Sequence, residues 1–359
     1  MAFEIIKSFD ELLKREDEWK ILYQEIDKRT VFQSYEWNAT WLENTEVEPY
    51  IFFHISPKDK SLDAIFPFCL DKSGTLRFIA DIHSDHCTFL IRSKNHTEIY
   101  LLLKKLAAEI LNTQAIKQIE LKNLSSDDPF LGDFFTQFNS RTFVYQSNGY
   151  SFLLLPTNKD VSCFAHLKSK KRSELKRISK QFVSCQTDLL EYPAPFPKND
   201  LKKLIQDMRQ SGQRDENFID NTLFHIVETL YRSKHLLIHL VTENERIIAA
   251  NLIMHSRDDH YLLWIDLFEE KKNLNLFSYI AFMEYLCHNK EKGIIIDFGR
   301  GLYPYKTNNF LPYIRLQMTF FHAKSLKGFS FYLLKHWMKE SVKPFYKKHK
   351  STINRILGR

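Results

Sequence analysis

The most informative segment of the chain is GIIIDFGRGLYPYK, residues 293–306. It begins with a run of β-branched residues that fits a buried strand, and the run ends at Asp297. Two glycines then bracket Arg300, which permits unusual backbone geometry and the close approach of a ligand. Open α/β sheets bind ligands at strand ends of this kind. We therefore expect a functional site here, with a structural Arg–Asp pair in a turn as the alternative.

Side chains near this strand end suit group transfer. Arg300 can pair with a phosphate or carboxylate in bidentate fashion. Tyr305 can donate a proton to a leaving thiolate, and Lys306 can neutralise charge nearby. Asp266 ends the apolar run YLLWID of residues 261–266 and is a candidate base, since desolvation raises the pKa of a carboxyl group. The alternative is an Asp that caps the strand end.

A second informative stretch is KSKKRSELKRISK, residues 168–180, which predicts a basic helix. Leu175, Ile178 and Phe182 are spaced three and four residues apart and form its apolar side. Seven lysines and arginines form the rest of the surface, which suits the phosphates of a coenzyme or of RNA. A solvated helix face is the alternative interpretation.

The same order of elements occurs twice along the chain. Each time helices come first, then three or four antiparallel strands, a helix and one more strand. The pattern predicts strands over residues 50–55, 62–70, 75–79, 87–91 and 117–121, and again over 236–242, 246–255, 261–267, 294–298 and 314–321. This layout belongs to the α/β class with mixed sheets. We expect one domain over 1–155, a second over 156–326, and a basic helix or tail over 327–359.

Net charge and cysteine content indicate the cellular compartment of the protein and the partners of its C-terminal tail. The 359 residues carry a net charge of +7, and residues 326–359 alone hold nine Lys/Arg against one acid. Such a tail can touch an anionic membrane peripherally, although we favour a helix at 329–343 docked on the protein, with mobility beyond about residue 350. The N-terminus lacks secretory features, and five scattered cysteines without C-x-x-C spacing favour a reducing compartment, so we expect a cytoplasmic protein.

Several classes of site are excluded by the motifs. The chain has no G-x-x-x-x-G-K-[ST], no G-x-G-x-x-G and no G-x-S-x-G. The metal-capable groups of HSDHC, residues 83–87, are too close in sequence to converge on one ion, so we expect no metal.

Taken together, these segments resemble the GNAT superfamily and, more narrowly, the tandem-GNAT acetyltransferases called CelD-like, which are associated with cellulose and exopolysaccharide biosynthesis. The family is distantly similar to the Fem-type aminoacyltransferases. The similarity covers most of the chain and is strongest over 160–310. Matching stretches are FQSYEW (32–37), IFPF (65–68), the basic helix (168–180), the strand 261–266 and DFGRG (297–301) with Tyr305-Lys306.

The resemblance implies two tandem GNAT-like domains with mixed, mainly antiparallel sheets flanked by helices. It also implies an acyl-CoA-dependent N- or O-acyltransferase, chiefly an acetyltransferase, that acts on a sugar, an amino acid or a similar small molecule. Acyl-CoA would lie where strands 261–267 and 293–298 separate, and backbone N–H groups there would polarise the thioester. Catalytic residues would be Asp266, Tyr305 and Lys306; coenzyme contacts would be Arg300, Gly301, Lys271, Lys272 and Ser278.

One stretch departs from the family pattern and keeps two alternatives open. Relatives have a glycine-containing turn where the coenzyme pyrophosphate rests, whereas residues 271–278, KKNLNLFS, contain no glycine. A helix N-terminus and two lysines can still hold phosphate. The alternatives are a Fem-type aminoacyl-tRNA-dependent ligase, the only case in which we expect a nucleic-acid partner, and a non-catalytic GNAT-like binding module.

Overall fold

The first part of the chain alternates short strands with helices. The computed structural model describes residues 3–57, 59–128, 130–138, 140–156, 162–290 and 293–342. Its first strands are β1 (Glu4–Ile6), β2 (Glu48–Pro49), β3 (Ile51–Ile55), β4 (Leu62–Phe66), β5 (Phe68–Leu70), β6 (Thr75–Phe78), β7 (Leu90–Ile91) and β8 (Gln118–Ser125). The helices here are α1 (Phe9–Leu13), α2 (Glu16–Glu25), α3 (Tyr35–Glu43), α4 (His96–Asn112) and α5 (Leu131–Thr136), with a 3-10 turn at Val31–Gln33.

The second part follows the same succession with longer strands. These strands are β9 (Thr142–Leu155), β10 (Gln186–Leu190), β11 (Leu236–Glu243), β12 (Arg246–Arg257), β13 (His260–Phe268), β14 (Ile294–Arg300) and β15 (Tyr313–Ala323). The helices are α6 (Ser169–Gln181), α7 (Lys198–Gln210), α8 (Asn221–Arg232), α9 (Leu274–Asn289), α10 (Pro304–Phe310) and α11 (Leu326–Trp337), with a π-helical turn at Met338–Val342. Below, the first half means residues 3–138 and the second half means residues 162–310.

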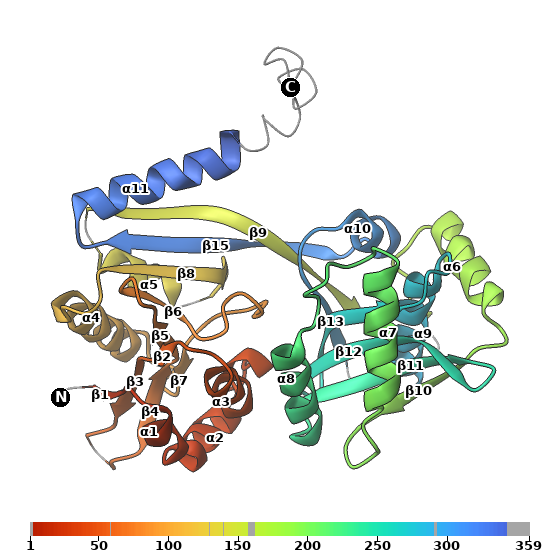
Figure 1. The fold of residues 1–359 in the computed structure, drawn as a ribbon, viewed down its shortest axis with the longest axis horizontal. Coiled ribbons are helices and arrows are strands. Elements are labelled where there is room, and N and C mark those ends of the chain that lie inside the picture. Colours follow the sequence, from red (N-terminus) through yellow and green to blue (C-terminus); the bar gives the residue numbers. More distant parts are fainter. Residues whose placement is uncertain are drawn as a thin grey trace.

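One mixed sheet runs through both halves, as Figure 1 shows. Its strand order is β10-β11-β12-β13-β14-β9-β15-β8-β6-β5-β2, and a smaller sheet has the order β1-β3-β4-β7. The pairs β6–β8 and β13–β14 are parallel, and the neighbours of both are antiparallel. The structure confirms the predicted α/β class with mixed, mainly antiparallel sheets flanked by helices.

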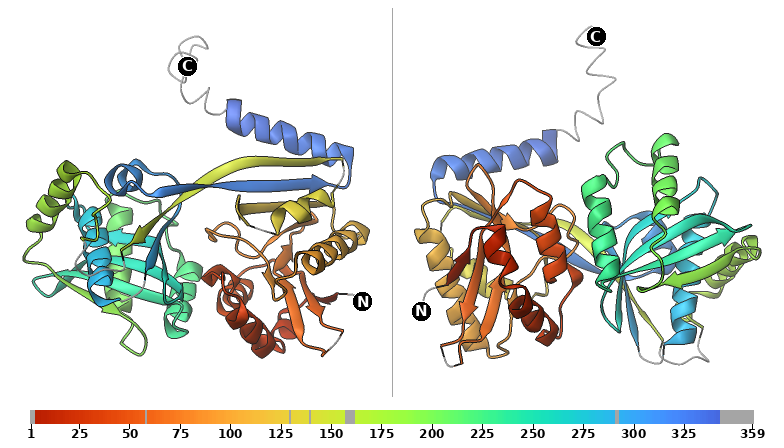
Figure 2. Two further views of the ribbon diagram at one scale, coloured as in Figure 1. Left: turned by 180° about the vertical axis from the view of Figure 1, so that it is seen from behind. Right: turned by 60° about the horizontal axis from the view of Figure 1, so that its bottom comes forward.

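Two long strands join the halves (Figures 1 and 2). β9 pairs with β15 over most of its length and with β14 at its end. β15, which the sequence places in the second domain, also pairs with β8 of the first half. The sequence did not predict β9, because its middle, YQSNG at 145–149, is polar and lacks apolar alternation. The division into 1–155 and 156–326 stays a prediction, and each of these two strands pairs with strands on the other side of it.

A shared hydrophobic core also holds the halves together. Trp19 and Trp37 of the first half are fully buried in a cluster that includes Leu204 of α7 and Leu230 of α8. Burial of these apolar side chains stabilises the contact by roughly 25 cal/mol for each Å² of apolar surface removed from water. Glu36 of α3 adds an ion pair, 3.2 Å from His235, which follows α8. The two halves are therefore packed against each other through an apolar cluster and an ion pair.

Helix α11 lies along β9 and β15 (Figure 2). Its Tyr332 ring stacks on Phe321 of β15, with centroids 3.5 Å apart. This confirms docking of the helix, over Leu326–Trp337 rather than 329–343. The predicted mobility beyond residue 350 lies outside the described residues. Among the helices of the described ranges, none has the length and apolar character needed to cross a bilayer.

Candidate functional site

Strands β13 and β14 separate shortly after they meet. They pair in parallel at three positions, His260↔Ile295, Tyr261↔Ile296 and Leu262↔Asp297, after which no pairing between them continues. β13 runs on to Phe268, paired with β12, and β14 runs on to Arg300 beside β9. Two parallel strands that diverge leave backbone groups of both without partners from the other strand. The opening lies where the sequence predicted the acyl donor.

The three predicted catalytic residues come together at this opening. Asp266 lies on the diverging part of β13, while Tyr305 and Lys306 lie in the first turn of α10. The Lys306 ammonium lies 5.7 Å from the Tyr305 ring centroid and donates a hydrogen bond to the Phe298 carbonyl of β14. The Tyr305 ring stacks on Tyr279 of α9 at 6.2 Å. Their catalytic roles stay a prediction.

Burial changes the proton affinities of this group. It lowers the pKa of Lys306, and the nearby carboxylates of Asp266, Asp85 and Asp297 offset only part of that effect. Burial raises the pKa of Tyr305, and the negative charge of Asp266 raises it further. A group with a lowered pKa gives up its proton more readily. Lys306 is therefore better suited than Tyr305 to protonate a leaving thiolate.

Arg300 contacts the first half, and Gly301 contacts β9. The Arg300 guanidinium donates to the Ile82 carbonyl at 2.9 Å and lies 3.5 Å from the Asp85 carboxylate. Gly301, with φ +96°, donates its amide to the Gly149 carbonyl at 2.8 Å. Arg300 also lines a cavity of about 360 Å³ beneath the end of α11, together with Lys122, Lys339 and others. A phosphate role for this pair stays a prediction.

The three coenzyme-contact residues predicted in the pyrophosphate turn differ in how accessible they are to a phosphate. Lys271 is paired with the Glu243 carboxylate at 2.7 Å, and Lys272 is exposed. Ser278 is buried within α9, where its hydroxyl donates to the Asn275 carbonyl at 2.9 Å. A phosphate at the start of α9 would meet backbone amides and Lys272 before it reached Ser278.

A buried carboxylate that the sequence did not single out lies beside the opening. Asp297 is 2% exposed, and its Oδ2 lies 2.6 Å from Nε2 of His86 and 3.6 Å from Nε2 of His260. Its Oδ1 accepts the Gly299 amide at 2.7 Å. Within the described ranges no His, Cys, Asp or Glu group has the arrangement of a metal site. Residues 211 positions apart give no spacing signal, so sequence reasoning could not join His86 to Asp297.

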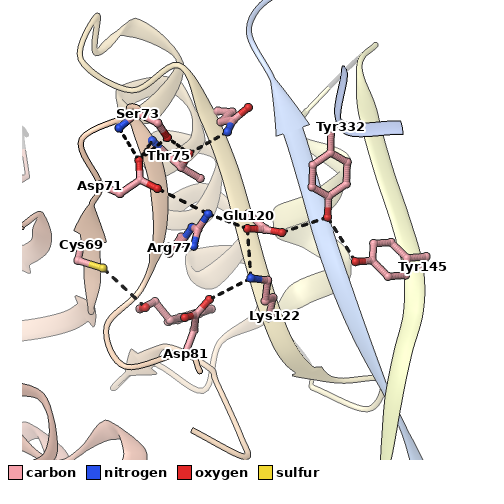
Figure 3. A network of polar contacts seen from close by, with 12 residues as sticks. Cys69, Asp71, Ser73, Thr75, Arg77, Asp81, Glu120, Lys122, Tyr145 and Tyr332 are labelled. Carbon is pink, nitrogen blue, oxygen red and sulfur yellow. Dashed lines mark hydrogen bonds and ion pairs between the residues drawn. The ribbon is translucent and has the colours of Figure 1, made fainter. Parts of the chain in front are cut away.

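The corresponding strands of the first half are closed by ion pairs (Figure 3). β6 and β8 also pair in parallel, at Thr75↔Gln118 and Leu76↔Ile119. Glu120 lies 3.1 Å from Arg77 and 3.2 Å from Lys122, and Lys122 lies 3.8 Å from Asp81. The Tyr332 hydroxyl of α11 donates to the same glutamate at 3.2 Å. Ion pairs of opposite charge therefore link the two strands.

The fold has counterparts among solved structures. FemX superposes with a TM-score of 0.60 at 11% identity, over 86% of this chain and 96% of that one. The C-terminal domain of a putative lysylphosphatidylglycerol synthetase from Agrobacterium fabrum (TM-score 0.58, 10% identity, 92% and 96% covered) and L-PGS from Bacillus licheniformis (0.58, 13%, 87% and 93%) are similarly close. Comparison with protein-family profiles and curated sequences found no match.

These similarities establish the class of fold. The chain has the fold of FemX and of these synthetase domains, in agreement with the Fem-type similarity that the sequence resemblance implied. At 10–13% identity the similarity concerns architecture alone. Function has to be argued from the residues of this chain.

Proposed function

We propose that the protein is an acyltransferase that moves an acyl group, most simply acetyl, from coenzyme A to an amine or hydroxyl of a small molecule. The observation that supports this most strongly is the separation of β13 and β14 after three residue pairs, with Asp266, Tyr305 and Lys306 gathered beside it. Unpaired backbone N–H groups at such an opening suit a thioester oxygen. Lys306 would then protonate the departing thiolate. A sugar or amino acid used in envelope polysaccharide synthesis is the acceptor that the sequence resemblance favours.

Titration calorimetry of the full chain with acetyl-CoA tests the donor. We expect micromolar binding that Lys272→Glu weakens, because its charge would meet the coenzyme phosphates. Lys60→Glu, an exposed charge reversal on the loop between β3 and β4, is the matched control and should bind as the original chain does. Heat signals that stay at the dilution level would remove coenzyme A from the proposal.

A second donor, aminoacyl-tRNA, is supported by α6. Five basic residues of this helix and its N-cap are exposed: Lys168, Lys170, Lys176, Arg177 and Lys180. Such a surface suits an RNA backbone. A gel-shift assay with aminoacylated tRNA distinguishes the donors. Salt-sensitive binding of tRNA, combined with no acetyl-CoA binding, would favour the ligase.

A further inference from the structure

A cavity of about 790 Å³ lies between the halves, next to the β13–β14 opening. His86 reaches it from the first half, and Asp297, His260, Tyr150 and Phe152 line it from strands β14, β13 and β9. A volume of this size accommodates a small-molecule ligand rather than only water. The polar groups in the cavity wall determine which ligand it can bind.

The wall contains one carboxylate that holds two imidazoles. Asp297 contacts His86 at 2.6 Å and His260 at 3.6 Å, and its other oxygen accepts the Gly299 amide. The two histidine side chains are only 12% and 14% exposed, yet both face the cavity. An Asp bonded to one ring nitrogen fixes the imidazole tautomer and orientation, so that the other nitrogen can act on a ligand.

The position of the carboxylate argues against a purely structural pair. Asp297 is the last β14 residue paired with β13, so it lies where the two strands begin to separate. Lys306, on the other side of this point, is within electrostatic reach of the same carboxylate. Buried ionic groups are costly to keep, and here they lie between a ligand-sized cavity and the proposed donor site.

On the basis of the proposed transfer reaction, we propose that this cavity binds the acceptor and that His86, oriented by Asp297, is its general base. The acceptor nitrogen or oxygen forms a bond to the thioester carbonyl carbon, and its proton passes to His86. The carbon–sulfur bond breaks, and the coenzyme thiolate takes a proton from Lys306 or water. The products are the acylated acceptor and free coenzyme A.

The lining also limits the kind of acceptor. Charged residues of both signs surround the cavity and are paired with each other, as in Arg92 with Glu25 at 2.7 Å and Arg257 with Asp259 at 3.2 Å. Apolar groups such as Phe89, Ile295 and Phe152 lie among them. This combination fits a molecule with an apolar or ring body and polar ends, larger than a bare alkylamine.

The base role predicts a specific pH dependence. The charged or titratable groups near His86 are Asp297, Asp85, Arg300, His260 and Tyr150. Burial alone would lower the pKa of His86, but the charge and hydrogen bond of Asp297 outweigh it and raise that pKa. Only neutral imidazole accepts a proton, so turnover should rise with pH through the raised pKa. In Asp297→Asn this rise should move to lower pH, and the maximal rate should fall.

The test follows coenzyme A release from acetyl-CoA by the full chain, with glucosamine, ethanolamine, lysine or water as acceptor. His86→Gln should lower kcat by about 10²–10⁴-fold while acetyl-CoA affinity by calorimetry stays unchanged. His54→Gln is the matched control, since His54 lies 4.0 Å from Asp63 in the first half, away from the cavity. It should leave kcat and its pH profile unaltered.

The other outcomes separate the two proposals. Acetyl-CoA binding with a normal rate and pH profile in His86→Gln would overturn the acceptor-base assignment and leave the transferase proposal intact. Acetyl-CoA binding with no turnover by any acceptor, water included, would also count against the assignment. Absence of acetyl-CoA binding by the unaltered chain would overturn the coenzyme A donor first, and the assignment with it.

Helix α11 supports a second, independent inference. One side packs on the sheet through Tyr332 and His336, whereas Phe331, Leu334 and Trp337 on the other side are 68%, 54% and 56% exposed. Lys327, Lys335 and Lys339 flank these apolar side chains. Residues 343–359 then add six Lys/Arg and no acid. A second copy of so basic a segment would be repelled. An anionic lipid surface, in contrast, offers negative charge to the lysines and an apolar interior to the exposed apolar side chains.

We infer that α11 lies on an anionic membrane surface. Sedimentation of the full chain with vesicles of phosphatidylglycerol and phosphatidylcholine should show binding that salt weakens, and phosphatidylcholine vesicles should bind far less. A Phe331→Ala, Leu334→Ala, Trp337→Ala variant should bind at least about tenfold more weakly. The control is Leu13→Ala with Ile21→Ala, which removes exposed apolar groups from α1 and α2. Equal binding by the triple variant, or dimerisation through α11 in place of lipid binding, would overturn the inference.

Discussion

The parallel pairs β6–β8 and β13–β14 occupy the same place in two similar successions of elements, but their polar side chains behave differently. Between β6 and β8, Arg77 and Lys122 each pair with Glu120, at 3.1 and 3.2 Å. Near β14, the buried Lys306 instead donates to a backbone carbonyl, and its pKa is lowered. In one pair the charged side chains form ion pairs with each other; in the other a buried amine has, among the residues that the structure describes, only a backbone carbonyl as its hydrogen-bond partner.

This difference shows how one fold can use the same position for stability or for chemistry. Paired charges hold two strands together and change little when a ligand arrives. A desolvated amine without a carboxylate in direct contact is poised to exchange a proton. The loop after β6 connects the two pairs, since it supplies Asp85 to Arg300 and His86 to Asp297. Residues of the first half thus contact the proposed site of the second half.

The largest expected effect comes from replacing the lysine at each position. Lys306→Met keeps most of the length of the side chain but removes its ammonium group, so kcat for coenzyme A release should fall about 10²–10⁴-fold. Lys122→Met should leave kcat unchanged and lower the free energy of unfolding by about 1 kcal/mol. A comparable loss of kcat in both variants would show that the two strand pairs do not differ in function.

Glycines at the two strand pairs should separate stability from activity. Gly74 (φ +81°) precedes β6, and a Cβ there would lie 2.8 Å from the Ala115 carbonyl; Gly299 (φ +68°) would press a Cβ against the Asp85 carboxylate. Alanine at either site should cost about 3 kcal/mol of unfolding free energy. Gly299→Ala alone should also lower kcat per folded molecule, because Asp85 would shift. Gly212→Ala, with open space around its Cβ, should cost about 1 kcal/mol.

The contact between the halves should weaken in acid. Burial would raise the pKa of Glu36, but the hydrogen bond and charge of His235, with a hydrogen bond from Lys20 of the first half, outweigh it and lower the pKa to about 2. The ionised Glu36 therefore stabilises the folded protein above pH 4.5. As the pH falls toward 2 the carboxylate is protonated, and the free energy of unfolding drops by on the order of 2 kcal/mol. Urea unfolding between pH 6 and 2.5 measures it. Glu36→Gln should remove this part of the pH dependence; an unchanged slope would contradict the assignment.

The smallest expected effect concerns the hydroxyl of Tyr332. Tyr332→Phe keeps the stacked ring and removes the hydrogen bond to Glu120, so it should lower the free energy of unfolding by about 1 kcal/mol. Chemical denaturation measures this change. The kcat should not move, because the network belongs to the closed strand pair. A decrease in kcat would indicate that α11 influences the second half.

The sequence predicted the local parts of this arrangement better than the long-range ones. The run at 293–296 and the motif after it correctly placed β14, and strand-end logic brought Asp266, Tyr305 and Lys306 to one region. It could not predict β9, whose middle is polar, or the pairing of β15 with β8. Contacts between His86 and Asp297 depend on how two halves pack, which spacing does not encode. For the proposed reaction, Lys306 suits the role of acid better than Tyr305, because burial shifts their pKa values in opposite directions.

We propose that the transfer site lies between β13 and β14 and not between β6 and β8. A crystal structure of the full chain with acetonyl-CoA, a non-transferable analogue of acetyl-CoA, tests this most directly. We predict density for the acyl group between the separating strands, near Lys306, with the pyrophosphate at the start of α9. Density for the acyl group at β6–β8, or a coenzyme bound away from both strand pairs, would contradict the account.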